Sequence, residues 1–182
     1  MEDENKCKKD LYINNSKEAL NMMKDSYFSE LNKTYQIDNK AGVISAVIIG
    51  LFTLYIPMIP FEKIKKSFRI FSKTNVVILT IMLYSLLLSF ILLMIAFYFF
   101  YKSYNVRNFK YLNLDDLIDE KYLRKSSEEM NVFFCEKYLK VIKHNFKVNN
   151  EKVMFLKKGI FLSFTSFTLI SVVLVTLLCF VS

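Results

Sequence analysis

Three long apolar segments without a single charged side chain constrain this chain more than any other feature. They run from Ala41 to Pro60, from Val76 to Tyr101 and from Ile160 to Val181. Each is about 20 residues or longer, the length that a helix needs to cross a hydrocarbon core about 30 Å thick. With 53% hydrophobic residues among 182, the chain has too little polar sequence to cover three such helices in water. We therefore predict an all-α integral membrane protein with three transmembrane helices.

The polar segments between the spans complete the predicted organisation, which is a single membrane domain. We expect a cytoplasmic amphipathic helix over 1–40, a basic linker over 61–75 and a cytoplasmic helical segment over 102–158. The spans themselves are predicted at 41–60, 76–101 and 160–181. Because residues 1–40 lack the short apolar core of a signal peptide, we expect the mature protein to begin at Met1.

Two polar segments carry stripes of residues at helical spacing. The first follows Ser16, an N-cap type of residue, and comprises Leu20, Met23, Tyr27, Leu31 and Tyr35. The second follows Glu128 and comprises Phe134, Tyr138, Val141, Ile142, Asn145, Asn149, Lys152, Val153 and Leu156. We predict two long helices, each continuous with a span, that bury these stripes against each other. Between them, residues 112–118 have an acidic start and predict a short connecting helix.

The distribution of basic residues predicts the orientation. Residues 1–40 hold seven Lys and residues 102–158 hold thirteen Lys or Arg, which together are 20 of the 25 basic residues. Three crossings place these segments on one side, and the positive-inside rule makes that side cytoplasmic, with the N-terminus there. The linker 61–75, with five basic residues and one acid, pulls the other way. Its aromatic and aliphatic spacing fits either a short interfacial helix or an ordinary basic turn.

Residue types that carry catalysis or bind metals are scarce. His144 is the only histidine and has no neighbour in the sequence that would make it a base or a ligand, and three Gly are too few for a phosphate-binding loop. The paired acids between 115 and 129 have basic neighbours, so we interpret them as solvated charge. Cys7, Cys135 and Cys179 are far apart, which argues against a disulfide framework or a zinc site. We expect no enzymatic activity, no metal and no cofactor.

Polar side chains within the spans are uncharged, which disfavours a coupled transporter, because transporters place ionisable groups at membrane depth. The last span has the most hydroxyls: Ser163, Thr165, Ser166, Thr168, Ser171 and Thr176. Small hydroxyl residues join helices across interfaces in membranes. We interpret this face first as a packing or oligomerisation surface, with a hydrated pore lining as the alternative.

The start of the first span places an acid and a base, Asp38 and Lys40, immediately before the apolar segment. A snorkelling lysine and a carboxylate at the interface would explain both. The segment Asp-x-Lys-Ala also resembles the start of the transmembrane effectors of Pycsar antiphage systems, small bacterial proteins partnered with a pyrimidine cyclase. The basic helix over 138–152 resembles them as well. Residues 104–109 contain neither the proline nor the glycine expected in that family, so an effector of a related cyclic-nucleotide defence system stays open.

The resemblance implies a protein of the bacterial inner membrane that rests inert, senses a nucleotide second messenger on its cytoplasmic side and then disrupts the membrane. The cationic and amide side chains that would bind such a ligand are Arg107, Lys110, Lys140, Lys143, Asn145, Asn149 and Lys152. Arg107 is the first choice because a guanidinium donates two parallel hydrogen bonds to phosphate. A single lysine can equally contact anionic lipid headgroups.

The expected partners are the lipid bilayer and further copies of the chain, assembled around the hydroxyl-bearing span, and no DNA or RNA polymer is expected. Two other functions stay open at this stage. One is a membrane-anchored subunit that recruits a partner through its amphipathic helices, and the other is a holin-like or toxin-like pore that needs no ligand.

Overall fold

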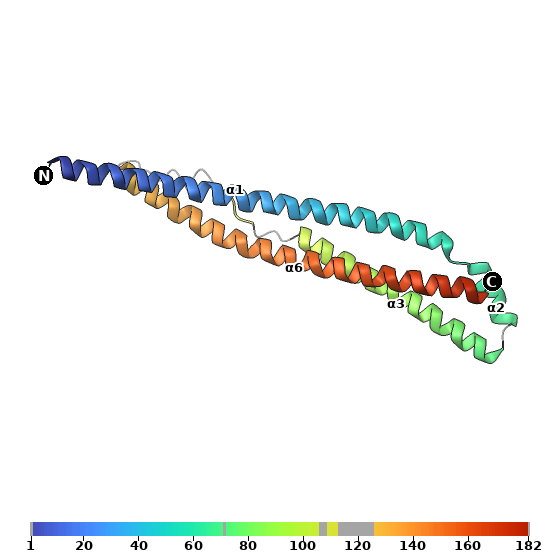
Figure 1. The fold of residues 1–182 in the computed structure, drawn as a ribbon. Helices are drawn as coiled ribbons and strands as arrows, with labels where there is room; N and C mark the ends of the chain where they lie inside the picture. The colour runs from blue at the N-terminus through green and yellow to red at the C-terminus, as the bar shows by residue number, and fades with distance from the viewer. Residues whose placement is uncertain (1, 71, 106–108, 113–125, 182) are drawn as a thin grey trace. The chain divides into compact units, whose positions relative to one another are not determined.

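The computed structural model describes residues 2–70, 72–105, 109–112 and 126–181 (Figure 1). In chain order its elements are α1 (Glu2–Tyr55), the 3-10 helix η1 (Ile56–Met58), α2 (Phe61–Ile70), α3 (Lys73–Tyr104) and α6 (Ser127–Val181). None of the described residues is in a strand. Three helices, within Asn14–Met58, Lys73–Tyr104 and Ser127–Phe180, are long and apolar enough to cross a membrane. The prediction of an all-α membrane protein with three such helices is confirmed.

Prolines and an N-cap set two of the helix boundaries. Pro57 lies in the first turn of η1 and Pro60 lies just before α2. Because proline removes a backbone donor and clashes with the preceding turn, the long first helix ends at Tyr55. At the start of α6 the side-chain oxygen of Ser126 accepts a hydrogen bond of 3.3 Å from the amide of Glu129. This is an N-cap interaction, which satisfies a donor that the first helical turn leaves unpaired.

The structure corrects one predicted detail and decides a second, whereas a third lies outside the described residues. The predicted N-cap at Ser16 is wrong: α1 already begins at Glu2, and the Ser16 hydroxyl accepts a hydrogen bond of 3.2 Å from the Asn131 amide. The basic linker contains α2, so Phe61–Ile70 is a helix and not a turn, and its position at the membrane interface stays a prediction. Residues 113–118 of the predicted connecting helix lie outside the described residues.

The chain folds as two compact units. Unit 1 comprises residues 1–37 and 106–151, and unit 2 comprises residues 38–105 and 152–182. Helices α1 and α6 contribute to both units, whereas α2 and α3 belong to unit 2 alone.

In unit 1, α1 and α6 pack side by side through a seven-residue repeat. Leu20, Tyr27 and Thr34 are buried on α1, at the spacing of a left-handed coiled coil. The ring of Tyr27 meets that of Tyr138 on α6 edge-to-face, with centroids 5.6 Å apart. The predicted stripe is thus confirmed at Leu20 and Tyr27 but is wrong at Tyr35, which is 61% exposed. A seven-residue repeat places Thr34 on the same helix face as Leu20 and Tyr27. Tyr35, the next residue, therefore points away from α6.

The buried positions of unit 2 follow the same repeat, with spacings of three and four residues along α3 and α6. On α3 they are Leu79, Leu86, Ser89, Leu93, Ala96, Phe100 and Ser103. On α6 the buried polar and small positions are Lys152, Gly159, Ser163 and Ser166. Small residues let backbones approach closely, which is how helices pack in membranes. Beyond them, Ile59, Ile64, Leu79, Leu86, Ile170, Val173, Leu174 and Leu177 form an apolar cluster that joins α2 to α3 and α6.

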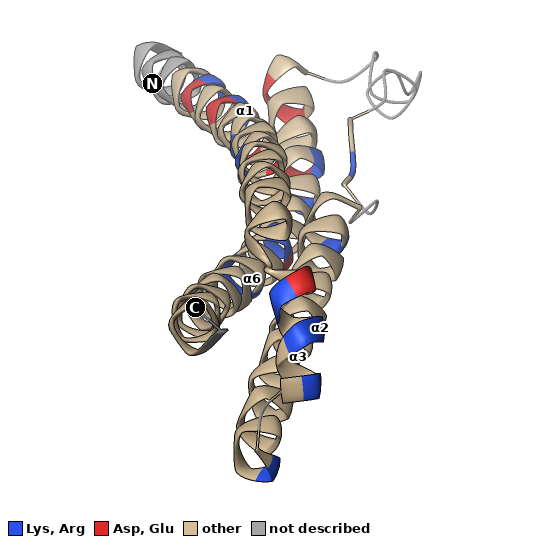
Figure 2. Cartoon of the chain, turned by 90° about the vertical axis from the view of Figure 1, so that its right-hand side faces the viewer, with Lys and Arg blue, Asp and Glu red and all other residues tan. Residues whose placement is uncertain are grey.

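Large apolar side chains also remain on the surface of unit 2. Phe161 and Phe164 of α6 are 71% and 75% exposed. Figure 2 shows α3 as almost uncharged between its ends, whereas α2 carries several basic residues. An apolar surface of this extent is typical of a membrane-facing protein. It agrees with the assignment of the long helices as membrane spans.

Candidate functional site

An ion pair between a buried lysine and a half-buried aspartate joins α6 to α1 in unit 2. The Lys152 ammonium nitrogen lies 2.8 Å from Asp38 Oδ1 and 3.0 Å from Oδ2. The Lys152 side chain is only 4% exposed and that of Asp38 is 26% exposed. Lysine is almost never fully buried unless it is paired, and an ionisable pair next to a membrane span is by default a candidate functional site.

The same lysine also holds α3. The hydroxyl of Ser103, which is fully buried, donates a hydrogen bond of 2.9 Å to the backbone carbonyl of Lys152. Lys152 therefore contacts α1 through its side chain and α3 through its main chain. All three helices that can span a membrane meet at this residue.

Two further polar contacts join the helices of unit 2. The Ser166 hydroxyl donates to the carbonyl of Ser89 at 2.7 Å, and the hydroxyls of Tyr55 and Ser171 are hydrogen-bonded at 2.7 Å. Interhelical hydrogen bonds of this kind contribute about 0.6 kcal/mol each in membranes. Each of them is therefore weak, and none replaces the ion pair.

The hydroxyl-bearing residues of α6 divide into two groups, apart from Ser163, which is buried and donates to the carbonyl of Gly159 on the same helix at 2.8 Å. Ser166 and Ser171 bond to other helices, in agreement with a packing role. Thr165, Thr168 and Thr176 are exposed, and each donates to a carbonyl one turn earlier on α6. These three threonines contact no other helix through hydrogen bonds in the described part of the chain. Their face remains available to lipid or to another copy.

Unit 1 holds two buried amides. Asn149 Oδ1 accepts a hydrogen bond of 2.8 Å from the Thr34 hydroxyl, and its amide nitrogen donates to the carboxylate of Glu30 at 2.8 Å. The side chain of Asn145 bonds both the amide and the carbonyl of Lys110, at 2.9 Å each. Asn145 and Asn149 have no exposed surface, so their hydrogen-bonding capacity serves the packing of this unit.

The structure separates the predicted ligand-binding residues. Arg107 lies outside the described residues. Lys110 is exposed, as are Lys140 and Lys143, and no described carboxylate forms an ion pair with any of these three lysines. The other three are buried and bonded within the chain: Asn145, Asn149 and Lys152. Ligand binding by these seven residues stays a prediction. Lys40, the base of the boundary motif, is exposed.

Sequence reasoning missed the partners of the buried polar residues. It singled out Asp38 and Lys152 separately, as a boundary acid and a ligand cation, and did not pair them. A seven-residue repeat counted from Leu20 would have found Thr34. Ser103 gives no signal in the sequence, because a serine near the end of an apolar helix is ordinary.

Metal-ligand clusters are absent from the described residues, where no group of three or more His, Cys, Asp or Glu could hold an ion. His144 is half-buried on α6. Cys135 and Cys179 are free thiols, and Cys7 lies among residues whose side chains are not described.

Fold and site together define an all-α membrane protein whose three spanning helices are joined at a buried lysine. Comparison with protein-family models, with curated proteins and with solved structures gave no match to this chain.

Proposed function

We propose that this protein is a nucleotide-gated membrane effector of the kind that the resemblance to Pycsar effectors implies. It binds a nucleotide second messenger through unit 1 on the cytoplasmic side of the bacterial inner membrane. Binding changes the packing of the spans in unit 2, and several copies then disrupt the membrane. The observation that carries this proposal is the Asp38–Lys152 pair, which joins α1 to α6 at the residue that also bonds α3.

A buried ion pair suits a switch better than a simple structural contact. Well-packed apolar residues of similar volume usually stabilise a core as well as such a pair does. Removing one partner of a buried pair, however, lowers the stability by about 3–5 kcal/mol. The pair therefore favours one packing of the spans strongly and penalises the intermediates. A ligand must prefer the other packing by about 5.5 kcal/mol to reverse a 1:99 population.

The ligand surface that we infer lies on the exposed side of α6 in unit 1. Lys140, Lys143 and Lys147 follow one another at spacings of three and four residues, and all three are exposed. Nearby in the sequence, the ring of Phe146 is 51% exposed and has the Lys33 ammonium 5.1 Å from its centroid. Lysines can neutralise a phosphate, and a base that stacks on an aromatic ring gains about 1–3 kcal/mol. The surface thus offers both chemistries that a nucleotide requires.

The membrane step is assigned to the exposed threonines of α6. Thr165, Thr168 and Thr176 leave a mildly polar face on a helix that otherwise presents large apolar side chains to lipid. Copies of the protein that meet through this face would line the space between them with threonine hydroxyls. A hydrated membrane lesion requires such a polar lining.

Leakage from liposomes tests the proposal. The purified full-length chain is reconstituted, a panel of cyclic mono- and oligonucleotides is added on the side that bears unit 1, and release of dye and K⁺ is followed. We expect leakage with one nucleotide and none without it. The variant Lys140→Glu/Lys143→Glu/Lys147→Glu should lose this response, whereas the matched charge reversal Lys63→Glu/Lys65→Glu/Lys66→Glu in α2 should keep it.

Other outcomes of the same experiment contradict the proposal. Leakage without any nucleotide would identify a toxin-like pore, and the absence of leakage with every nucleotide would favour a membrane-anchored subunit. Equal loss of the response in both charge reversals would assign the lysines to headgroup contacts and not to the ligand.

A further inference from the structure

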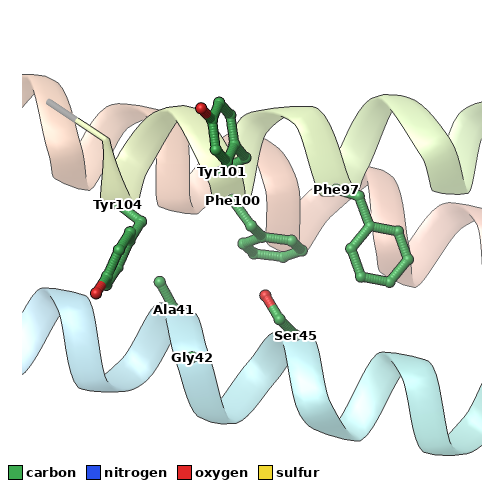
Figure 3. A pocket seen from close by; sticks show the side chains of 7 residues that line it. All are labelled: Ala41, Gly42, Ser45, Phe97, Phe100, Tyr101 and Tyr104. Atoms are coloured by element: carbon green, nitrogen blue, oxygen red, sulfur yellow. The ribbon is translucent and has the colours of Figure 1, made fainter.

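A pocket of about 220 Å³ lies between α1 and α3 within unit 2. Figure 3 shows the rings of Phe97, Phe100 and Tyr104 extending from α3 toward the small residues Ala41, Gly42 and Ser45 of α1. The α1 residues begin the first apolar segment, and Tyr104 ends α3. The pocket therefore lies where the apolar helices reach the membrane boundary.

The pocket has a glycine on one wall and a closely packed aromatic ring on the other. A Cβ atom added to Gly42 would meet no atom within 4 Å, so α1 presents only backbone at this position. On the other wall Phe100 is 2% exposed, and its ring packs so closely on Gly159 of α6 that a Cβ there would lie 2.8 Å away. That contact holds the Phe100 ring against α6, so that the ring forms a fixed part of the pocket wall.

Two hydroxyls that line the pocket from opposite walls, those of Ser45 on α1 and Tyr104 on α3, have no hydrogen-bond partner among the described residues. Figure 3 shows the Ser45 oxygen directed toward α3 and the Tyr104 oxygen directed toward α1. By contrast, the hydroxyls of Ser89, Ser103 and Ser166 each donate to a carbonyl. Ser45 is half-buried and Tyr104 is 65% exposed, so each hydroxyl can donate to an acceptor supplied from outside the chain.

We propose that this pocket binds one acyl chain of a membrane glycerolipid, with the ester carbonyl near Ser45 and Tyr104. The volume is below the ~300–1,000 Å³ of pockets that enclose a drug-sized ligand, so it fits a segment of a larger amphiphile. Aromatic carbons line the space that the acyl chain would occupy. Tyrosine is typical of the membrane–water interface, where the ester groups of lipids lie. The bound acyl chain lies between α1 and α3 and keeps these helices apart, close in the sequence to Asp38 of the ion pair. The lipid site does not depend on nucleotide sensing.

Retention of lipid by the purified protein tests this site. The full-length chain is extracted in a mild detergent from membranes that contain phosphatidylglycerol, and bound phospholipid is measured by native mass spectrometry. Gly42→Phe fills the pocket, and Gly50→Phe is the matched control, because a Cβ at Gly50 also meets nothing within 4 Å. We expect wild type and Gly50→Phe to retain about one phospholipid per protomer. The amount retained by Gly42→Phe should be lower by a factor of about ten or more. Equal retention by both variants would overturn the site.

A second variant tests the orientation of the lipid and does not rely on filling the pocket. Ser45→Ala/Tyr104→Phe removes both hydroxyls and keeps the apolar walls. We expect it to hold phosphatidylglycerol about fivefold more weakly for each hydrogen bond lost, and to hold an ether-linked analogue as wild type does. Unchanged affinity for phosphatidylglycerol would overturn the placement of the ester, and a free fatty acid that competes equally well would assign the site to fatty acids instead.

Discussion

Replacing Asp38 should lower the stability of the protein more than replacing its partner Lys152. Asp38→Asn leaves the Lys152 ammonium, 4% exposed, without a counter-charge, whereas Lys152→Met leaves an aspartate that is 26% exposed and reaches water. Breaking a buried pair costs about 3–5 kcal/mol, and the partial exposure of Asp38 favours the lower end, about 3 kcal/mol, for Asp38→Asn. Lys152→Met should cost about 1 kcal/mol, the net contribution of an ordinary hydrogen bond. The double variant removes both charges and should return close to wild type.

Thermal unfolding followed by circular dichroism in one detergent measures these differences. At about 2–4 °C per kcal/mol for a chain of this size, Asp38→Asn should unfold about 6–12 °C below wild type. Lys143→Met, which removes an exposed lysine that pairs with no described carboxylate, is the control and should leave the melting temperature unchanged. A larger loss in Lys152→Met than in Asp38→Asn, or a double variant no more stable than Asp38→Asn, would refute the reasoning.

Three further predictions follow from the packing of each unit. Gly159→Ala places a Cβ 2.8 Å from the Phe100 ring and should destabilise by about 1–3 kcal/mol in thermal unfolding, whereas Gly50→Ala, which meets nothing, should gain up to about 1 kcal/mol. Tyr27→Cys/Tyr138→Cys should be joined by a short bis-thiol reagent in the purified protein alone, because these rings touch; crosslinking that needs an added partner would instead support an anchoring subunit. Thr165→Leu/Thr168→Leu/Thr176→Leu should insert and melt as wild type but abolish leakage, and unchanged leakage would exclude this face as the lesion.

The long helices were predictable because hydrophobic length alone determines them. No charged residue interrupts the three apolar segments. Helix α3 covers the second segment with three further residues at each end, whereas α1 and α6 begin 39 and 33 residues before their segments. The break after Tyr55 follows from Pro57 and Pro60, whose effect on a helix is local. The helical form of the basic linker was one of two alternatives, since its apolar residues could also have belonged to a turn.

The site was only partly predictable, because pairing between distant residues depends on the rotation of one helix against another. Asp38 and Lys152 are 114 positions apart, and each alone had an ordinary explanation at a membrane boundary. The assignment of Tyr35 in place of Thr34 to the interior shows the same difficulty. Spacings of three and four residues allow both, and only the packing partner on α6 selects between them.

Crosslinking α3 to α6 tests most directly whether the packed form of unit 2 is the closed state. In a chain whose native cysteines are replaced, Ser89→Cys/Ser166→Cys puts thiols where a serine hydroxyl now bonds the facing carbonyl at 2.7 Å. Liposomes that carry this variant are assayed for nucleotide-dependent leakage before and after a short bis-thiol crosslink. We predict leakage only in the uncrosslinked protein. Equal leakage after crosslinking would contradict the account, because the membrane would then be disrupted without any rearrangement of these two spans.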